Sequence, residues 1–460
     1  MKGRVILTAG EMRAAEARSI AAGTSVETLM ERAGQAAAAA IRRFAGPMPA
    51  LVLCGPGNNG GDGYVVARAL AAAGQDVRVA ATGEPKTAAA SAARAAWGRE
   101  VHALADVEPA PLLIDSLFGT GLTRGLLRDA AAELEALAGM ARITAAIDLP
   151  SGISTDDGAI LSPVPDCDLT VTFQTLKPAH LLQPAARHMG RIVVADIGIE
   201  AASDLHEIAR PRLAAPGPES HKFTRGLVTV IAGGMAGAGA LSAGAALRAG
   251  AGAVRLQARE PVHGVAAAII QNPRDPLDRI DDKRIGALLL GPGLAPDDEG
   301  RALFEAAAGS GHPLVLDAGA LRILADGAAL PAAGPTAILT PHEGEFAALF
   351  GEDGGSKVER ARAAAAKVGA VIVYKGPDTV VAAPDGRAAI HAATAHWLAT
   401  AGAGDVLAGT IAAMRAAGMA AFEAACAGIW LHGRAAALAG PFLIADDLIA
   451  HLPAACAECL

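Results

Sequence analysis

Apolar runs of about five residues alternate with longer alanine-rich amphipathic stretches along the whole chain. Parallel strands joined by crossover helices produce this pattern, because such strands are buried on both faces. The pattern predicts an α/β protein in both halves. In the N-terminal half, helices are expected over residues 11–22, 30–44 and 65–72, and strands over 50–54, 77–81, 112–115, 143–148, 169–173 and 191–196.

A segment with two prolines, one glycine and no hydrophobic period, residues 214–220, separates this half from the next. A fresh series of strands follows it, at 227–231, 253–256, 287–290, 313–317, 337–339 and 371–374, and helices close the chain from residue 404 onward. The sequence therefore predicts two domains, residues 1–213 and 220–460, joined by a linker at 214–219.

Composition narrows the function classes. The net charge of -8 and the absence of a Lys/Arg block argue against a nucleic-acid binder. Five scattered cysteines favour a reducing, cytoplasmic setting, and the Cys456–Cys459 pair is expected in a frayed tail. Neither a signal peptide nor an apolar stretch of the ~20 residues needed for a membrane span is expected.

The first candidate site is the glycine-rich segment 55–63, which follows a predicted strand and contains G-x-G-x-x-G. That motif alone is a weak sign of a dinucleotide fold, and the carboxylate of Asp62 does not suit a pyrophosphate cradle. Two more polar clusters, 115–122 and 148–152, follow later strands. Oxygens of Asn59, Asp115 and Ser151 could converge on a hard monovalent or divalent cation, and the backbone of 119–125 could wrap an anion. Simple caps and turns are the alternative for each segment, but three successive strand ends favour a site.

These motifs closely resemble the NAD(P)H-hydrate epimerase family over roughly residues 7–200, including Leu7 to Met12 and Leu29 to Gly34. The resemblance implies that Asp148 touches the reacting part of a hydrated nicotinamide dinucleotide, and Asp148 is our candidate for its proton transfers. It also implies a potassium ion held by Asn59, Asp115 and Ser151. The remaining implied substrate contacts are Asn58, Asn59, Gly60, Gly61, Asp62, Gly119, Thr120, Gly121, Leu122, Thr123, Arg124 and Gly125.

The second candidate site is the segment 400–405, in which Gly402 and Gly404 precede Asp405 at a helix start. Backbone N–H groups and the helix N-terminus would cradle an oxyanion, and Asp405 would take a proton from a substrate hydroxyl. Two other elements could contribute: 342–345, with an imidazole and two carboxylates, and 375–379, with a cation and backbone amides for a nucleotide phosphate. The chain has no Walker A sequence and is not a P-loop enzyme.

This half resembles the ribokinase-like fold and, within it, the ADP-dependent NAD(P)H-hydrate dehydratase family, over roughly residues 220–440. The resemblance places Glu345 where a carboxylate organises magnesium through water. Two departures stand out, Ala295 and Ala403, where the family commonly has glycine and serine. The implied hydrate contacts are Ala238, Gly293, His342 and Asp405, and the implied ADP contacts are Lys375, Gly376, Pro377, Asp378, Thr379, Gly402, Ala403 and Gly404.

The two resemblances predict a Rossmann-like three-layer α/β/α domain followed by a ribokinase-like domain, in the order of the bifunctional NAD(P)H-hydrate repair enzymes. The chain is expected to epimerise R and S hydrates of NADH and NADPH (NADHX and NADPHX). It is also expected to dehydrate the S form with ADP, Mg²⁺ and K⁺, releasing AMP and phosphate, and to be a homo-oligomer. One alternative is a small-molecule kinase of the hydroxymethylpyrimidine type fused to a regulatory dinucleotide-binding module. Another is a nucleotide-sensing binding module. Absorbance at 340 nm separates these alternatives, because it is restored only when a hydrate is dehydrated.

Overall fold

The computed structural model describes residues 3–271, 275–330, 334, 336–352, 354–392 and 395–460. The chain forms two compact units, residues 4–205 and residues 206–460, with residue 3 grouped with the second unit, so the main boundary falls ahead of the predicted linker. Residues 206–213 join the C-terminal unit, because the N–H of Ile208 donates to Ile390 O at 2.9 Å and that of Leu213 donates to Cys459 O at 2.8 Å. The units are described separately below.

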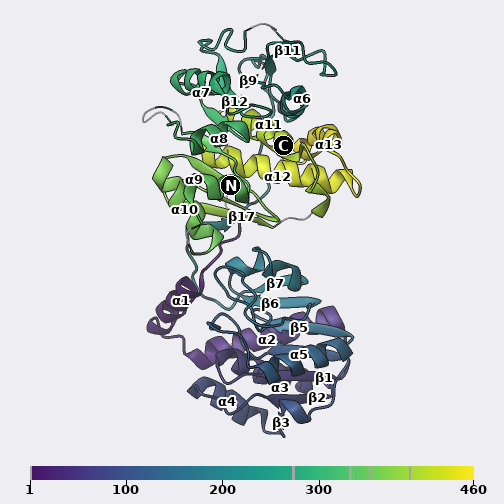
Figure 1. Cartoon of the computed structure of the whole chain (residues 1–460). Helices are drawn as coiled ribbons and strands as arrows, with labels where there is room; N and C mark the ends of the chain where they lie inside the picture. Colours follow the sequence, from purple (N-terminus) through teal and green to yellow (C-terminus); the bar gives the residue numbers. More distant parts are fainter. Residues whose placement is uncertain (1–2, 272–274, 331–333, 335, 353, 393–394) are drawn as a thin grey trace. The chain divides into compact units, whose positions relative to one another are not determined.

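The N-terminal unit is built on a seven-stranded sheet with the order β3-β2-β1-β4-β5-β6-β7, in which all strand pairs are parallel. Helices connect several of these strands, so the predicted α/β class is confirmed (Figure 1). The strands are β1 (Ala50–Cys54), β2 (Val77–Ala81), β3 (His102–Ala103), β4 (Leu112–Ser116), β5 (Ile143–Ile147), β6 (Leu169–Phe173) and β7 (Arg191–Ala195). The helices are α1 (Ala9–Ala21), α2 (Val26–Ala45), α3 (Asn58–Ala72), α4 (Ala88–Trp97) and α5 (Arg128–Met140).

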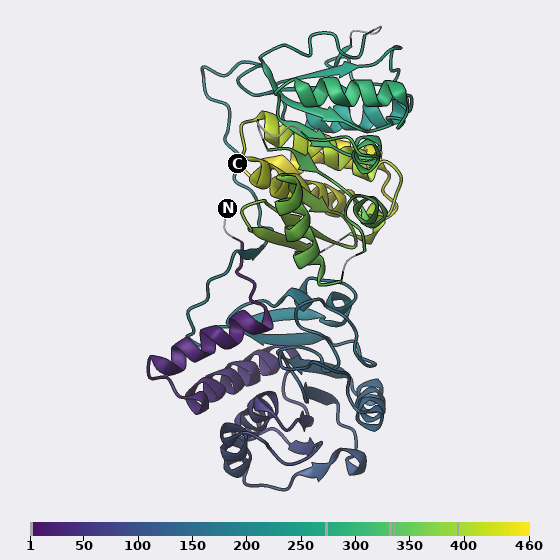
Figure 2. The ribbon, with the colours of Figure 1, turned by 60° about the vertical axis from the view of Figure 1, so that its left-hand side comes forward.

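Successive side chains of a strand point to opposite faces of the sheet, so the buried residues of this unit form a core on each face. Val52 and Cys54 of β1 pack into a cluster with α2, α3 and α4, whereas Leu51 and Leu53 pack into a second cluster with α5. These three layers are those predicted. Figure 2 shows the unit from another side, with α1 and α2 in purple.

Helix α3 begins at Asn58, seven residues before the predicted start at 65, so residues 58–63 of the glycine-rich segment are helical rather than a loop. Its glycines are needed for close packing. A Cβ on Gly61 would lie 2.5 Å from the terminal methyl of Met30, and a Cβ on Gly63 would lie 2.8 Å from Ser116 Cβ. Propensity opposed a helix here, and tertiary packing overrode it.

The C-terminal unit contains a ten-stranded sheet, ordered β11-β10-β9-β12-β13-β14-β15-β16-β17-β8. The pairs from β11 through β15 are parallel, and β15–β16–β17 are antiparallel. The strands are β8 (Leu205–Glu207), β9 (Leu227–Ile231), β10 (Ala253–Gln257), β11 (Ile270–Gln271), β12 (Ile285–Leu290), β13 (Leu314–Leu316), β14 (Ile338–Leu339), β15 (Val371–Tyr374), β16 (Asp378–Ala382) and β17 (Ala388–Ala392). The helices are α6 (Ala236–Arg248), α7 (Asp298–Gly309), α8 (Gly319–Ala325), α9 (Glu343–Phe350), α10 (Lys357–Val368), α11 (Ala403–Ala416), α12 (Ala421–Ala439) and α13 (Ala445–Ala457).

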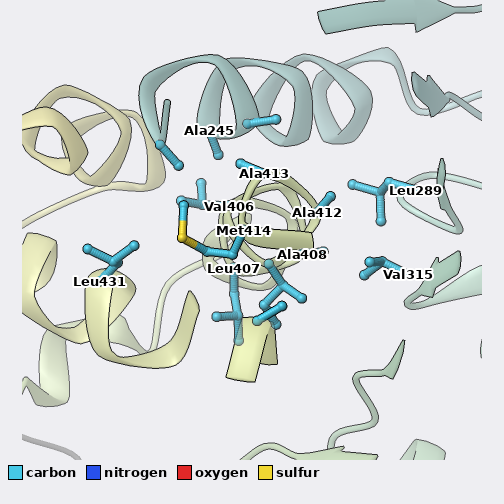
Figure 3. Close-up of a cluster of buried hydrophobic side chains, with 14 of the residues drawn as sticks. Ala245, Leu289, Val315, Val406, Leu407, Ala408, Ala412, Ala413, Met414 and Leu431 are labelled. Carbon is cyan, nitrogen blue, oxygen red and sulfur yellow. The ribbon is translucent and has the colours of Figure 1, made fainter. Parts of the chain in front are cut away.

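Helix α11 lies at the centre of this unit's main core, surrounded by residues of α6, α12 and the sheet (Figure 3). Its small residues permit close approach: a Cβ on Gly409 would lie 2.1 Å from Ser242 O of α6. Ala403 and Val406 at the start of α11 are buried in the same core, which supports the first turn of the helix.

The expectation of a frayed C-terminal tail is wrong. Helix α13 continues to Ala457, and Cys459 is buried in the main core. The sequence signal was misleading because α13 supplies apolar residues such as Leu448 and Leu452 that dock it on the unit. Across the described parts of the chain, no helix has the length and apolar character required to cross a membrane.

Candidate active sites

Both sheets have a point at which the strand order reverses, between β1 and β4 and between β9 and β12. In open α/β sheets, ligands bind beyond the carboxyl ends of the strands at such a point. At both points, glycines allow two backbone segments to approach closely. A Cβ on Gly55 would lie 1.7 Å from Leu117 O, and one on Gly233 would lie 2.1 Å from Gly293 O.

At the first switch point lies a cavity of about 580 Å³. One wall, formed by the ends of the strands and the start of α3, is rich in polar groups. The other, formed by α1 and the first half of α2, is mostly apolar. The first wall includes Asn58, Asn59, Asp62, Gly119, Thr120, Gly121, Asp148 and Lys177, and the second includes Met12, Arg13, Glu16, Ile20, Val26, Leu29, Met30 and Ala33.

Asp148 follows β5 with a φ of 67°, a left-handed conformation that aims its carboxylate into this cavity. Its Oδ1 accepts hydrogen bonds from Lys177 Nζ at 2.8 Å and Thr172 Oγ1 at 2.9 Å, and its Oδ2 accepts one from the Thr120 N–H at 3.1 Å. Burial would raise the pKa of Asp148. The charge and hydrogen bond of Lys177 outweigh burial, with help from the hydrogen bond of Thr172, and the pKa lies below its ordinary value.

Lys177 is the main site residue that sequence reasoning missed. Its side chain is 1% exposed, and Nζ donates to Asp148, Thr172 and the Phe173 carbonyl. The Lys177 N–H donates to His180 Nδ1 at 2.8 Å, so His180 Nε2 carries the proton that it donates to Asp148 O at 2.8 Å. Burial, together with Lys177, lowers the pKa of His180 to about 4 and keeps it neutral. The available signal was a lysine shortly after a buried strand.

Asp115 and Ser151, the predicted potassium ligands, lie together behind the cavity and are fully buried. Ser151 donates to Asp115 from its Oγ and its N–H, both at 2.7 Å. Within residues 4–205, all described, no lysine or arginine pairs with Asp115, and burial raises its pKa despite the hydrogen bonds of Ser151 and Leu117. A buried carboxylate without a cationic partner suits a monovalent cation.

The third predicted ligand, Asn59, lies at the cavity edge of this group. A Cβ on Gly119 would lie 2.9 Å from both Asn59 Oδ1 and Asp148 Oδ2, so Gly119 separates the two side chains. Asn59 Nδ2 is buried without a hydrogen-bond partner among the described residues. That amide is available to a ligand in the cavity.

Some predicted substrate contacts do not line the cavity. Gly60 and Gly61 are buried in α3 and serve its packing, and the later part of the predicted anion loop, residues 122–125, lies outside the lining. A Cβ on Gly125 would lie 2.3 Å from Leu161 O, which indicates a structural role for this glycine. The cavity thus uses residues 119–121 of that loop, and the roles of Leu122, Thr123 and Arg124 stay predictions.

In the C-terminal unit, Asp405 lies in the first turn of α11, as predicted. Gly402 is the N-cap residue with a φ of 83°, which favours glycine, and it has no side chain with which to cap the helix. The amides of the first turn thus remain available to an anion. Ala403, where serine is common in the family, begins the helix and is buried.

Facing this turn is a second carboxylate, Asp317, which sequence reasoning also missed. Its Oδ1 accepts from Lys375 Nζ at 2.8 Å and from Thr340 Oγ1 at 2.7 Å. A Cβ on Gly404 would lie 3.6 Å from Lys375 Nζ and 3.9 Å from Asp317 Oδ2, which brings the three elements together. The next residue, Ala318, has a φ of 45°, an unusual conformation that often marks functional sites.

These neighbours set the protonation of Asp405. Burial raises its pKa to about 6, the charge of Asp317 adds to the rise, and Lys375 opposes it. Burial disfavours the charge of Lys375, but Asp317 outweighs it and the pKa of Lys375 lies above its usual value. The site therefore presents a carboxylate poised near neutral pH beside a fixed cation, as a general base requires.

His342 and Glu345 form a reciprocal cap at the start of α9. The Glu345 N–H donates to His342 Nδ1 at 3.2 Å, and the His342 N–H donates to Glu345 Oε2 at 3.0 Å. The His342 side chain is 58% exposed, so it can meet a ligand while it caps the helix. No group of three His, Cys, Asp or Glu that could hold a metal ion occurs among the described residues.

The residues of segment 375–379, predicted to bind a phosphate, lie in two different environments. The Lys375 amine faces Asp317, and Gly376 and Pro377 form the exposed turn between β15 and β16. Asp378 begins β16 and is buried against Lys357, whose Nζ donates to Asp378 Oδ1 at 2.5 Å and to its carbonyl at 2.7 Å. Asp378 thus supports the turn from beneath, and Thr379 continues the strand.

The remaining predicted contacts lie at the switch point. Gly293 has a φ of 70°, and a Cβ there would lie 2.7 Å from Met235 O, which explains the glycine. Ala238 is buried in the first turn of α6. Ala295, where the family has glycine, is not in a left-handed conformation, so alanine is compatible with the loop.

Two family models match the chain. One, described as YjeF-related protein N-terminus, matches residues 26–179, and the other, described as NAD(P)H-hydrate dehydratase, matches residues 228–445. A relative from Salinibacter ruber, named a bifunctional NAD(P)H-hydrate repair enzyme Nnr, is 34% identical over 525 aligned residues, covering 98% of this chain and 96% of its own. A protein of the same name from Escherichia coli is 34% identical, covering 94% and 89%.

Among solved structures, a ribokinase-like superfamily protein from Enterococcus faecalis matches with a TM-score of 0.50 and 20% identity, covering 56% of this chain and 98% of its own. An ADP/ATP-dependent NAD(P)H-hydrate dehydratase from Bacillus subtilis, co-crystallized with ATP/Mg²⁺, matches with 29% identity and a TM-score of 0.49, covering 54% and 95%. The fold thus defines a two-domain α/β protein with a Rossmann-like half and a half with the ribokinase-like fold. Given relatives that span nearly its whole length, the chain belongs to the bifunctional NAD(P)H-hydrate repair enzyme family.

Proposed function

We propose that this chain repairs hydrated NADH and NADPH in two steps, each in its own unit. The N-terminal cavity interconverts the R and S hydrates, and the C-terminal site dehydrates the S form with ADP. The observation that carries the proposal is Asp405 at the uncapped start of α11, facing Asp317 and Lys375, in a chain that also has the Asp148–Lys177 cavity.

In the C-terminal site, the hydroxyl of the hydrate is a poor leaving group until it is phosphorylated. Asp405 takes its proton, since a carboxylate with a pKa of about 6 is both ionised at neutral pH and basic enough to help. The amides of Gly404 and its neighbours, with Lys375, stabilise the charge of the transferred phosphoryl group. Phosphate then leaves with the C–O electron pair while the ring nitrogen lone pair forms a C=N bond. Loss of a proton from the neighbouring ring carbon to solvent forms the ring C=C bond and returns the electron pair to nitrogen, and AMP, phosphate and the dinucleotide are released.

The nucleotide and its metal fit the chain's residues as follows. The exposed turn at Gly376 and the start of α11 offer backbone amides to the nucleotide phosphates. Thr379 lies just after that turn, in β16. Asp317 Oδ2 and Glu345 would hold Mg²⁺ through water, and the ion would supply charge neutralisation for the phosphates.

In the N-terminal cavity, Asp148 takes part in the proton transfers of epimerisation, and Lys177 keeps its carboxylate ionised and oriented. Asn59 and residues 119–121 position the hydrate. Asp115, Ser151 and Asn59 would hold K⁺, which would neutralise the buried charge of Asp115. We further propose a cytoplasmic homo-oligomer, with the linker at 214–219 allowing each domain to keep its own site.

The test is incubation of the purified full-length protein with separately prepared R and S hydrates, Mg²⁺, K⁺ and either ADP or ATP. Recovery of 340 nm absorbance from S without delay, recovery from R after epimerisation, and release of AMP from ADP are expected. Phosphorylation of a pyrimidine alcohol without any 340 nm recovery would instead support the small-molecule kinase. Nucleotide binding without turnover of either compound would support the sensing module.

A further inference from the structure

Helix α1 places an acidic side chain in an otherwise apolar stripe that faces the N-terminal cavity. Met12, Glu16 and Ile20 occupy positions i, i+4 and i+8, which share one face of a helix, and all three line the cavity. An interior position on such a stripe normally carries an apolar residue, because a carboxylate there loses hydration.

The carboxylate of Glu16 is not used by the fold. Within residues 4–205, every one of which is described, no hydrogen bond or ion pair engages it. By contrast, Glu11 of the same helix caps α1 through Thr8 and accepts a hydrogen bond from Ser203 at 2.9 Å. Glu16 therefore lies ready for a ligand in the cavity, whereas Glu11 is structural.

The charged groups that face Glu16 come from both walls. Asp148 and Lys177 lie on the strand-end wall, Asp62 lies in α3, and Arg13 precedes Glu16 on α1. Burial raises the pKa of Glu16, and Asp148 raises it further, while Lys177 and Arg13 oppose the rise. The pKa values of Glu16 and Asp148 are thus shifted in opposite directions, which is the pattern of an acid and a base that act together.

From this arrangement we propose that Glu16 is a catalytic acid of the N-terminal site, acting on one face of the hydrated ring while Asp148 acts on the other. The inference rests on the proposed epimerase function and deepens it. Epimerisation at the carbon that bears the hydroxyl requires the hydroxyl to leave from one face of the ring and a water to add to the other face. One carboxyl group on each wall of the cavity can assist these two events.

The step balances as follows. Protonated Glu16 gives its proton to the hydroxyl, the C–O bond breaks with its electron pair on oxygen, and the ring nitrogen lone pair forms a C=N bond. One water leaves. A second water adds to the same carbon from the opposite face and gives its proton to Asp148, and the electron pair of the C=N bond returns to nitrogen. Proton exchange through solvent then restores Glu16 and Asp148.

The experiment uses the full-length chain without nucleotide, so that the C-terminal site is silent, and follows the epimer ratio from pure R or pure S hydrate in ¹⁸O-labelled water. Glu16→Gln should lower kcat for interconversion by about 10²-fold or more, with KM changed less than about threefold. Glu16→Asp should recover part of the rate. Wild-type interconversion should slow as pH rises and Glu16 ionises, and each inverted product should carry one oxygen from solvent.

Two controls separate chemistry from folding. Arg18→Gln alters an exposed residue of α1 outside the cavity and should leave interconversion unchanged. Dehydration of S hydrate by the same Glu16→Gln preparation should match wild type and confirm the enzyme concentration. If the wild type interconverts epimers and Glu16→Gln does so at the same rate, or if the original oxygen is retained on inversion, the role of Glu16 is wrong and the proposed function stands. If the wild type does not interconvert them, the proposed function itself fails.

Discussion

The two units use the same three side-chain types in opposite ways. In the N-terminal unit, Asp148 accepts from Lys177 and Thr172 and also faces the cavity. In the C-terminal unit, Asp317 accepts from Lys375 and Thr340, at nearly the same distances, but the proposed base is a different carboxylate.

The difference lies in which carboxylate each lysine pairs with. Lys177 contacts Asp148, the proposed reactive carboxylate, directly, so the pKa of Asp148 lies below its ordinary value. Lys375 is held by Asp317, and Asp405, which is partly buried next to that pair, has a pKa of about 6. The same pair of residues can therefore lie in a site whose proposed reactive carboxylate is ionised or in one where it is titratable, depending on whether the lysine pairs with that carboxylate directly.

The largest expected effect is loss of the C-terminal base. Asp405→Asn keeps the shape of the α11 start and removes the proton acceptor, so dehydration of S hydrate should fall by about 10²- to 10⁴-fold. Epimerisation should be unchanged, because none of the residues that line the N-terminal cavity comes from α11. Stopped assays with absorbance at 340 nm measure dehydration, and the epimer ratio measures epimerisation. Near-normal recovery of absorbance would remove Asp405 from the mechanism.

Breaking the N-terminal pair should affect both activity and stability. Lys177→Met leaves the buried Asp148 charge without its partner, which should lower epimerisation by about 10²-fold and destabilise this unit by about 3–5 kcal/mol. Thr172→Val, the matched control, removes the hydroxyl that donates to Asp148 and accepts from Lys177 but keeps both charges, so it should cost less, about 1.5–3 kcal/mol. Urea titration with both activities followed would test this. Equal losses from the two variants would show that the lysine charge is unimportant.

The two sites should also respond differently to pH. Dehydration requires ionised Asp405, so its kcat/KM should be level above about pH 6 and fall tenfold per unit below it. Asp148 has a pKa below its ordinary value and stays ionised over pH 5–8, so epimerisation should show no acid limb from this group. Profiles of both activities on one preparation make the comparison. A shared acid limb near pH 6 would contradict the assignment.

The smallest expected effect concerns the cation. Replacement of K⁺ by tetramethylammonium should weaken epimerisation several-fold, because a bulky ion cannot approach the buried oxygens of Asp115 and Ser151. Ser151→Ala should reduce the difference between the two buffers. Epimerisation that proceeds equally fast in both buffers, measured with wild type, would argue against an ion at this position.

Much of this architecture follows from the sequence. Nearly every long strand was predicted within a residue or two, because buried parallel strands read as apolar runs, and Gly402 to Asp405 marked the helix start by local chemistry. Lys177, Asp317 and Glu16 were missed for a physical reason. Each depends on neighbours that the sheet order and helix packing bring together, such as Asp317 with Thr340 and Lys375, and no local pattern marks that proximity. The short β3, β8 and β11 and the β16–β17 hairpin lack a distinctive period.

The central claim is that two independent sites in one chain share the work on a mixed pool of hydrates. It is tested most directly with pure R hydrate, ADP and Mg²⁺, and two full-length variants, Asp148→Asn and Asp405→Asn. Alone, each should restore 340 nm absorbance no faster than spontaneous epimerisation or residual dehydration allows. Mixed, they should restore it at a rate approaching wild type, since Asp405→Asn makes S hydrate and Asp148→Asn consumes it. A mixture no faster than the sum of its parts would contradict the division of labour between the units.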